Sequence, residues 1–191
     1  MKETVNSTKT KIHDVVADTQ PGPQGIGIAV AFDWGLAIQI LVTPLVTLLL
    51  GLPVTFKQLS PVVGTLLSTL ITLPFAALLA VFGEGIRRGW RWTRPVQLIA
   101  NALLFLGGLA LIPNVWNGMK QGNYWPIVTD VILLIFSPLI AWRMAGKRST
   151  RWFDTVYSAV ARKRHGGAWP FLIGIWAVVG GILQAIAALK R

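Results

Sequence analysis

The sequence of 191 residues has no cysteine, only two histidines and only seven acidic residues. The absence of cysteine excludes disulfide bonds, thiolate nucleophiles and cysteine-ligated zinc or iron–sulfur centres. Charged residues make up 13% of the chain, which is roughly half of what a soluble globular domain carries. The composition therefore excludes an ordinary soluble domain.

Motifs for catalysis and for cofactor binding are also missing. The two histidines, His13 and His165, lie in polar segments, so haem or pigment ligation inside a helical bundle is disfavoured. There is no HExxH pair, no phosphate-binding loop and no GxSxG turn. We therefore expect a protein that is not an enzyme, with no catalytic residue, no cofactor and no metal ligand set.

Apolar residues dominate the chain and fall into long runs. They make up 53% of the sequence, and the mean hydropathy is +0.59. Five runs are long enough for a helix to cross about 30 Å of hydrocarbon. They span approximately 28–52, 60–83, 95–115, 124–145 and 167–188. The prediction is an all-α, polytopic membrane helix bundle, with a polar N-terminal arm at 1–25 and one membrane domain at 26–191.

The distribution of basic residues predicts the orientation of the five spans. Most of the 18 basic residues lie on the side that holds the N-terminus, the loop after the second run and the loop after the fourth. Cytoplasmic loops carry such an excess, so the N-terminus is expected in the cytoplasm and the C-terminus outside an inner, or plasma, membrane. Because the basic residues separate apolar runs, the net charge of +11 indicates membrane lipid rather than nucleic acid.

The segment 149–164 is too polar to span the bilayer. On a helical wheel its apolar side chains, from Trp152 to Val160, share one arc, and its charged side chains share the opposite arc. This pattern predicts a basic amphipathic helix that lies at the membrane surface; the alternative is a loop helix packed on its own bundle. The residues expected to contact anionic headgroups are Arg148, Arg151, Arg162, Lys163 and Arg164.

Small residues recur at intervals of three or four in three of the five runs. Such stripes let helix backbones approach closely in lipid, where burial of leucine against leucine gives no driving force. They predict either a tight bundle or a homo- or hetero-oligomer. The residues expected at these contacts are Gly64, Ser68 and Thr72 in the second run, and Gly174, Gly181 and Ala185 in the fifth.

Two of the acidic residues have structural interpretations. Asp33 stands near the start of the first run, where the remaining apolar residues suffice to cross the membrane, so an interfacial position is expected. Glu84 precedes Arg87 and Arg88 by three and four residues, and this spacing predicts an ion pair on a helix.

Asp130 is the main candidate for a functional residue. The fourth run is too short to cross the membrane without it, so Asp130 must lie inside a span, where Asn101 or Gln184 would offer a polar partner. Either Asp130 makes one interhelical hydrogen bond that fixes register, or it couples the movement of a proton or cation.

These observations predict a non-catalytic, multi-pass membrane protein, acting as an accessory or structural subunit or as a self-associating bundle. The alternative is a small proton- or cation-coupled transporter or channel that uses Asp130.

Overall fold

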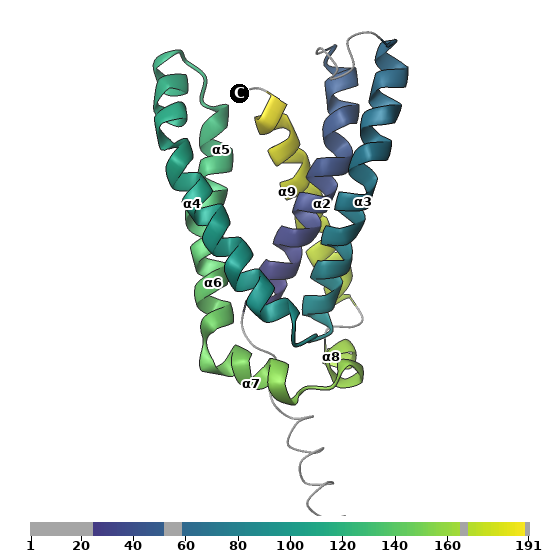
Figure 1. The fold of residues 1–191 in the computed structure, drawn as a ribbon, viewed down its shortest axis with the longest axis vertical. Coiled ribbons are helices and arrows are strands. Elements are labelled where there is room, and N and C mark those ends of the chain that lie inside the picture. Colours follow the sequence, from purple (N-terminus) through teal and green to yellow (C-terminus); the bar gives the residue numbers. More distant parts are fainter. Residues whose placement is uncertain (1–24, 52–58, 165–167, 190–191) are drawn as a thin grey trace, which may run out of the picture.

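We describe the protein from a computed structural model, which defines residues 25–51, 59–164 and 168–189. Within these ranges the chain forms helices and turns, with no strand. The polar N-terminal arm at 1–25 lies outside the described residues except for Gly25. Figure 1 shows the helices running between two ends of the molecule.

Five helical segments are long and apolar enough to span a membrane, which confirms the predicted number. They are α2 (Ile26–Leu49), α3 (Pro61–Arg87), α4 (Thr93–Lys120), a composite helix from Trp125 to Ala145, and α9 (Trp169–Leu189). The largest error in the predicted bounds is in the third segment, because α4 continues to Lys120 rather than ending at 115. Polar residues from Asn114 onward extend this helix instead of breaking it.

The composite helix consists of α5 (Trp125–Val131), the π-helical segment η1 (Ile132–Phe136) and α6 (Ser137–Ala145). Pro138 has no N–H to donate to the carbonyl of Leu134, and its ring crowds that carbonyl. The wider π-helical turn directly before Pro138 accommodates this defect without ending the span.

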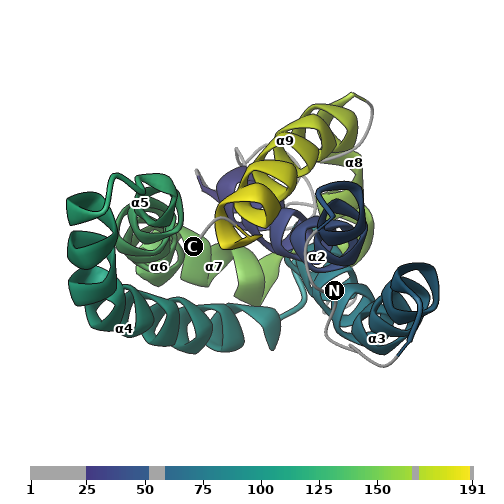
Figure 2. The same ribbon diagram turned by 90° about the horizontal axis from the view of Figure 1, so that it is seen from above.

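The helices form two groups (Figure 2). The first group contains α2, α3 and α9, with α2 packed against both of the others; the second contains α4 and the composite helix. The groups join through the turn at residues 88–92, where Gly89 has a φ of 71° that a side chain would disfavour. They meet again where α9 leans across to contact α5.

Two short helices, α7 (Lys147–Thr155) and α8 (Ser158–Arg164), close the end of the molecule at which that turn lies. We call this the basic end, and we call the end holding Leu49, Pro61 and the turn at 121–124 the opposite end. The prediction of a single helix at 149–164 is wrong. The backbone is extended at Val156, and this break divides the segment into α7 and α8. The aromatic side chains Trp152 and Phe153 are buried in the protein, as expected for a helix packed on its own bundle.

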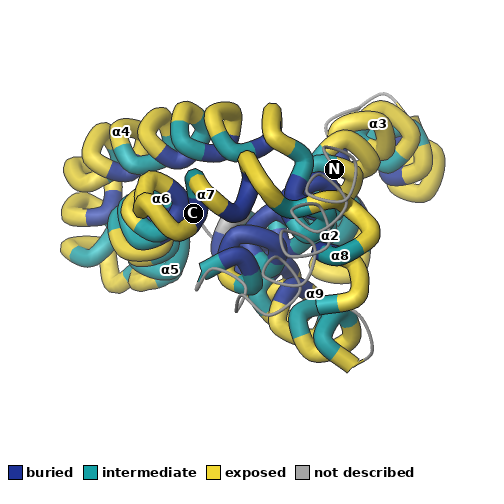
Figure 3. Tube along the Cα trace, turned by 90° about the horizontal axis from the view of Figure 1, so that it is seen from below, coloured by how far each residue is buried: buried dark blue, intermediate teal, exposed yellow. Residues whose placement is uncertain are grey.

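The main hydrophobic core lies at the basic end, where both groups contribute to it (Figure 3). Ile86 of α3, Ile140 and Met144 of α6, and Phe153 of α7 are almost completely buried there. Two hydrogen bonds reinforce this junction: Arg94 Nε donates to the carbonyl of Met144 at 3.0 Å, and Arg91 Nη2 donates to that of Asp154 at 2.8 Å.

Small residues mediate the crossing of α2 and α9. A Cβ atom on Gly181 would lie 2.6 Å from the backbone oxygen of Gly35 and 2.8 Å from Ile38, so only glycine fits at this contact. Ala177 and Ala185 are also buried. In α3, Gly64 and Ala76 are buried as well. Gly181, one of the predicted small residues, thus lies at a contact between two helices of the same chain.

Candidate functional site

Asp33 of α2 lies at the junction of three helices. Its side chain is 4% exposed and packs beside Gly83 of α3, where an added Cβ would come within 3.3 Å of Asp33 Cβ. The neighbouring Trp34 donates its indole N–H to the carbonyl of Ala80 at 3.3 Å, which holds α2 and α3 together. Asp33 was expected at the membrane interface; the structure adds that both groups of helices enclose its carboxyl group.

Gln97 and Asn101 of α4 extend this polar cluster. Gln97 Nε2 donates to Asp33 Oδ1 at 3.3 Å, and Asn101 Nδ2 donates to the backbone oxygen of Gln97 at 2.8 Å. Both amide side chains are 1% exposed. Three buried oxygens, Asp33 Oδ2, Gln97 Oε1 and Asn101 Oδ1, accept no hydrogen bond from the part of the chain that the structure describes.

Such a cluster has a definite chemical capacity. An ionised carboxylate with a single hydrogen bond is costly to bury, and the cost falls when a proton or a cation neutralises it. No Lys or Arg within residues 25–51, 59–164 and 168–189 forms a salt bridge with Asp33. Asp33 is therefore a candidate for a proton-binding group where α2, α3 and α4 meet.

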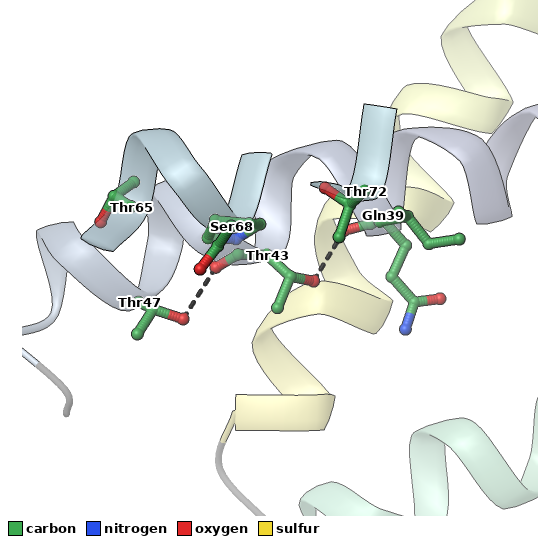
Figure 4. Close-up of a pocket in the computed structure, with 8 residues that line it drawn as sticks. Gln39, Thr43, Thr47, Thr65, Ser68 and Thr72 are labelled. Atoms are coloured by element: carbon green, nitrogen blue, oxygen red, sulfur yellow. Dashed lines mark hydrogen bonds between the residues drawn. The ribbon is translucent and has the colours of Figure 1, made fainter. Parts of the chain in front are cut away.

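A second polar feature, the hydroxyl crevice, lies between α2 and α3 (Figure 4). It encloses about 300 Å³. Its lining residues are Gln39, Ile40, Thr43, Pro44 and Thr47 from α2, and Thr65, Ser68 and Thr72 from α3. Ser68 and Thr72 belong to the predicted packing stripe, and the structure places both of them on this crevice.

The hydroxyl groups of the crevice all donate to the backbone of their own helix. Thr43 donates to the carbonyl of Gln39 at 2.6 Å, Thr47 to that of Thr43 at 2.8 Å, and Ser68 to that of Gly64 at 2.8 Å. Each hydroxyl oxygen keeps its acceptor capacity after donating its single hydrogen. The hydroxyl groups thus present acceptors rather than donors to the crevice.

Asp130 lies in α5, within the fourth span, and is 7% exposed. Gln184 of α9 is buried as well, and the two helices carrying Asp130 and Gln184 pack against each other. Asn101, also predicted as a partner, belongs instead to the cluster with Gln97 and Asp33. Sequence reasoning missed Gln97 and did not foresee that Asp33 is buried beside it; polar residues four apart on one helix, Gln97 and Asn101, were the available signal.

The predicted ion pair of Glu84 is confirmed. Arg87 and Arg88 approach its carboxylate at 2.6 and 2.7 Å. The C-terminal end of α3, which carries this group, lies at the basic end, where α7 and α8 also lie (Figure 1). There Arg148, Arg151, Arg162 and Lys163 are exposed, whereas Arg164 is half-buried with its guanidinium 5.2 Å from the centre of the Trp152 ring.

An apolar groove of about 730 Å³ runs along α2, α3 and α9. Its small residues are Ala37, Ala76, Ala77, Ala80, Gly174 and Ala177, and larger side chains such as Trp34, Leu73 and Phe171 flank them. Gly174, predicted at a helix contact, has nothing within 4 Å of the position that a Cβ would take. The groove therefore leaves part of the small-residue surface of α9 uncovered within the chain.

Comparisons with known proteins identify no relative: no family model, no curated protein and no solved structure matches the chain. Within the described ranges, no group of three or more histidine or acidic side chains is arranged to hold a metal ion.

Proposed function

We propose that this chain is a non-catalytic, multi-pass membrane protein that acts as an accessory or structural subunit. The observation that carries the proposal is the apolar groove along α2, α3 and α9. We infer that a transmembrane helix of another subunit or of a second copy occupies this groove, because a floor of alanine and glycine allows close backbone approach in lipid.

Gly174 and Gly180 of α9 offer a matched pair for testing the groove. Neither glycine has an atom of the described structure within 4 Å of its Cβ position, but Gly174 lines the groove and Gly180 does not. A Gly174→Ile substitution should fill the groove and release the partner, whereas Gly180→Ile should leave the complex intact. Because the chain has no cysteine, a single Ala77→Cys variant also permits site-specific cross-linking.

The test is the size of the purified complex in mild detergent and the cross-links formed through Ala77→Cys. Cross-links to a copy of the chain would identify a homo-oligomer, and cross-links to another membrane protein would identify a hetero-oligomer. Identical size and identical cross-links for Gly174→Ile and Gly180→Ile would contradict the proposal.

We further propose that the basic end faces the cytoplasm and contacts anionic lipid, with the N-terminus inside and the C-terminus outside an inner membrane. The exposed Arg and Lys side chains of α7 and α8 support this orientation. A reporter that is active only in the cytoplasm should work when fused to the N-terminus and fail when fused to the C-terminus. Activity at the C-terminus would contradict the topology.

A second candidate function, proton- or cation-coupled transport, is favoured by the buried cluster of Asp33, Gln97 and Asn101. Ionisable groups inside membrane spans commonly mark proton or ion pathways. Asp33→Asn retains hydrogen-bonding capacity but cannot bind a proton. In proteoliposomes with an imposed ion or pH gradient, this variant should fold and lose coupled flux, while Asp130→Asn should keep it. If Asp130→Asn loses coupled flux and Asp33→Asn keeps it, coupling would be assigned to Asp130. Absence of coupled flux through the wild-type protein would remove this candidate function.

A further inference from the structure

The hydroxyl crevice carries an inference that does not depend on a partner in the groove. We propose that it binds a small monovalent cation through the oxygen atoms of α2 and α3. This inference deepens the second candidate function by naming the class of ion, but it concerns binding and holds with or without transport.

The lining chemistry selects a cation over an anion. Thr65 donates its hydroxyl hydrogen to the carbonyl of Pro61 at 2.8 Å, and Thr72 donates to that of Thr69 at 3.1 Å. With Thr43, Thr47 and Ser68 doing the same, five hydroxyl groups have committed their only donor to their own helices. Among the lining side chains, only the amide group of Gln39 has hydrogen-bond donors that are not bonded to the carbonyls of its own helix.

Pro44 adds a backbone acceptor at the same place. In an α-helix the N–H of residue 44 would bond to the carbonyl of Ile40, but proline has no N–H. Ile40 and Pro44 both line the crevice. The Ile40 carbonyl therefore lacks its usual helical partner on the helix face that the crevice follows.

The charge of the crevice favours a monovalent ion. None of its lining residues is acidic. Calcium and magnesium are bound in proteins largely through carboxylates, whereas neutral oxygen groups suffice to replace part of the hydration shell of an alkali ion. A volume of about 300 Å³ can hold such an ion together with water.

When it is ionised, Asp33 places a negative charge on the same face of α2. It precedes Ile40 by seven residues, which is two helical turns or about 10 Å. Asp33 Cβ packs beside Gly83 of α3, and the crevice lies between the same two helices, while the carboxyl group accepts a hydrogen bond from Gln97 of α4. An ionised Asp33 would attract a cation in the crevice across this distance.

The test uses the purified full chain in a neutral detergent with choline chloride. Choline is replaced by sodium, potassium or ammonium at a constant ionic strength of about 0.15 M. Direct ion binding and the midpoint of thermal unfolding are both measured, since a ligand that binds the folded state raises the midpoint. At least one of the three ions should bind saturably and raise the midpoint, and the ion that does so identifies the preferred species.

Three hydroxyl variants locate the site. Thr43→Val and Ser68→Ala each remove one oxygen atom that lines the crevice. Each substitution should weaken ion binding about tenfold, which corresponds to about 1.4 kcal/mol. Thr69→Val is the matched control, because Thr69 also donates to its own helix, at 2.9 Å, but does not line the crevice. Asp33→Asn should weaken binding without abolishing it.

Several results would overturn the proposal. These are the absence of saturable binding for all three ions, unchanged affinity in Ser68→Ala, or an equal loss of affinity in Thr69→Val. If Thr43→Val fails to fold, the comparison of Ser68→Ala with Thr69→Val decides the question. Loss of partner binding in Gly174→Ile would not change the ion affinity of the crevice. The proposal of a partner helix in the groove and the proposal of a cation in the crevice can therefore fail independently.

Discussion

The basic end and the opposite end of this molecule are built differently. At the basic end, large side chains such as Phe153, Ile140 and Met144 pack into one core shared by both groups of helices. Toward the opposite end, the buried residues of α9 are mostly alanine and glycine, while Leu49 of α2 is 83% exposed. The comparison teaches that tertiary packing holds the chain together at one end and leaves helical surface available at the other.

The difference has a physical origin in the chain connections. The turn at residues 88–92 is short and holds α3 and α4 together at the basic end, where a Cβ on Gly85 would lie 2.9 Å from Thr93 Cγ2. From there the two helices diverge (Figure 1). Only 17% of the apolar stretch of each is buried in the chain, compared with 39% for α2. The rest of each stretch is not buried within the chain.

The largest expected effect is at the core of the basic end. Phe153→Ala removes a buried aromatic side chain and leaves a cavity, so it should lower the free energy of unfolding by about 3 to 5 kcal/mol. Phe75→Ala, on an exposed position of α3 outside the groove, should change it by less than about 0.5 kcal/mol. Unfolding in mixed detergent measures both values. Similar losses would show that the basic end is not the stable core.

The next effect concerns the crossing of α2 and α9. Gly181→Ile forces a branched side chain against the Gly35 backbone and should cost about 3 kcal/mol, whereas Gly180→Ile on the same helix meets open space. The yield of folded protein and its unfolding midpoint report the difference. The sequence pattern predicts weaker assembly for Gly181→Ile, but the structure indicates that the fold itself is damaged. Normal stability together with loss of an oligomer would support the original interpretation.

The spans were predictable because length and apolarity alone determine them. A helix needs about 20 apolar residues to cross the bilayer, and every predicted run contains most of an observed helix. Local chemistry was equally informative. Glu84 pairs with both Arg87 and Arg88, as their spacing along the helix predicts.

The candidate sites were less predictable because they depend on contacts between distant segments. Asp33 and Gln97 are 64 residues apart, and nothing in the spacing of either run indicates which face of α2 meets α4. The surroundings of α7 were equally hard to predict from the sequence. The helical wheel placed Trp152 and Phe153 on the arc opposite the charged side chains, but a helix that faces lipid and a helix that faces its own bundle have the same amphipathic pattern.

A smaller effect is expected at the Asp33 cluster, which joins the two groups of helices. Asp33→Leu leaves the Gln97 amide buried without its acceptor and should cost about 1 to 2 kcal/mol. Asp33→Asn keeps an acceptor and should cost less. The same unfolding assay compares them. Equal stability of the Leu variant and the wild type would mean that the hydrogen bond does not hold α2 to α4.

The smallest effect concerns lipid binding at the two ends. Replacing both Arg162 and Lys163 with Gln should weaken the association of anionic lipid by about 1 kcal/mol per residue. Lys120→Gln at the opposite end should have a smaller effect, because it removes one cation, whose Nζ lies 5.5 Å from the centre of the Trp116 ring. Retention of labelled anionic lipid in detergent measures the difference, which added salt should abolish. Equal retention by the two variants would contradict a headgroup site at the basic end.

The contrast between the two ends can be tested most directly by measuring distances between α3 and α4 at both of them. Spin labels on Val81 and Val96 report on the basic end, and labels on Val62 and Asn117 report on the opposite end; all four side chains are exposed. Few contacts permit larger local motion. Electron paramagnetic resonance in lipid should therefore give a narrow distance distribution for the first pair and a broad one for the second. Equally narrow distributions for both pairs in the isolated protein would contradict the account.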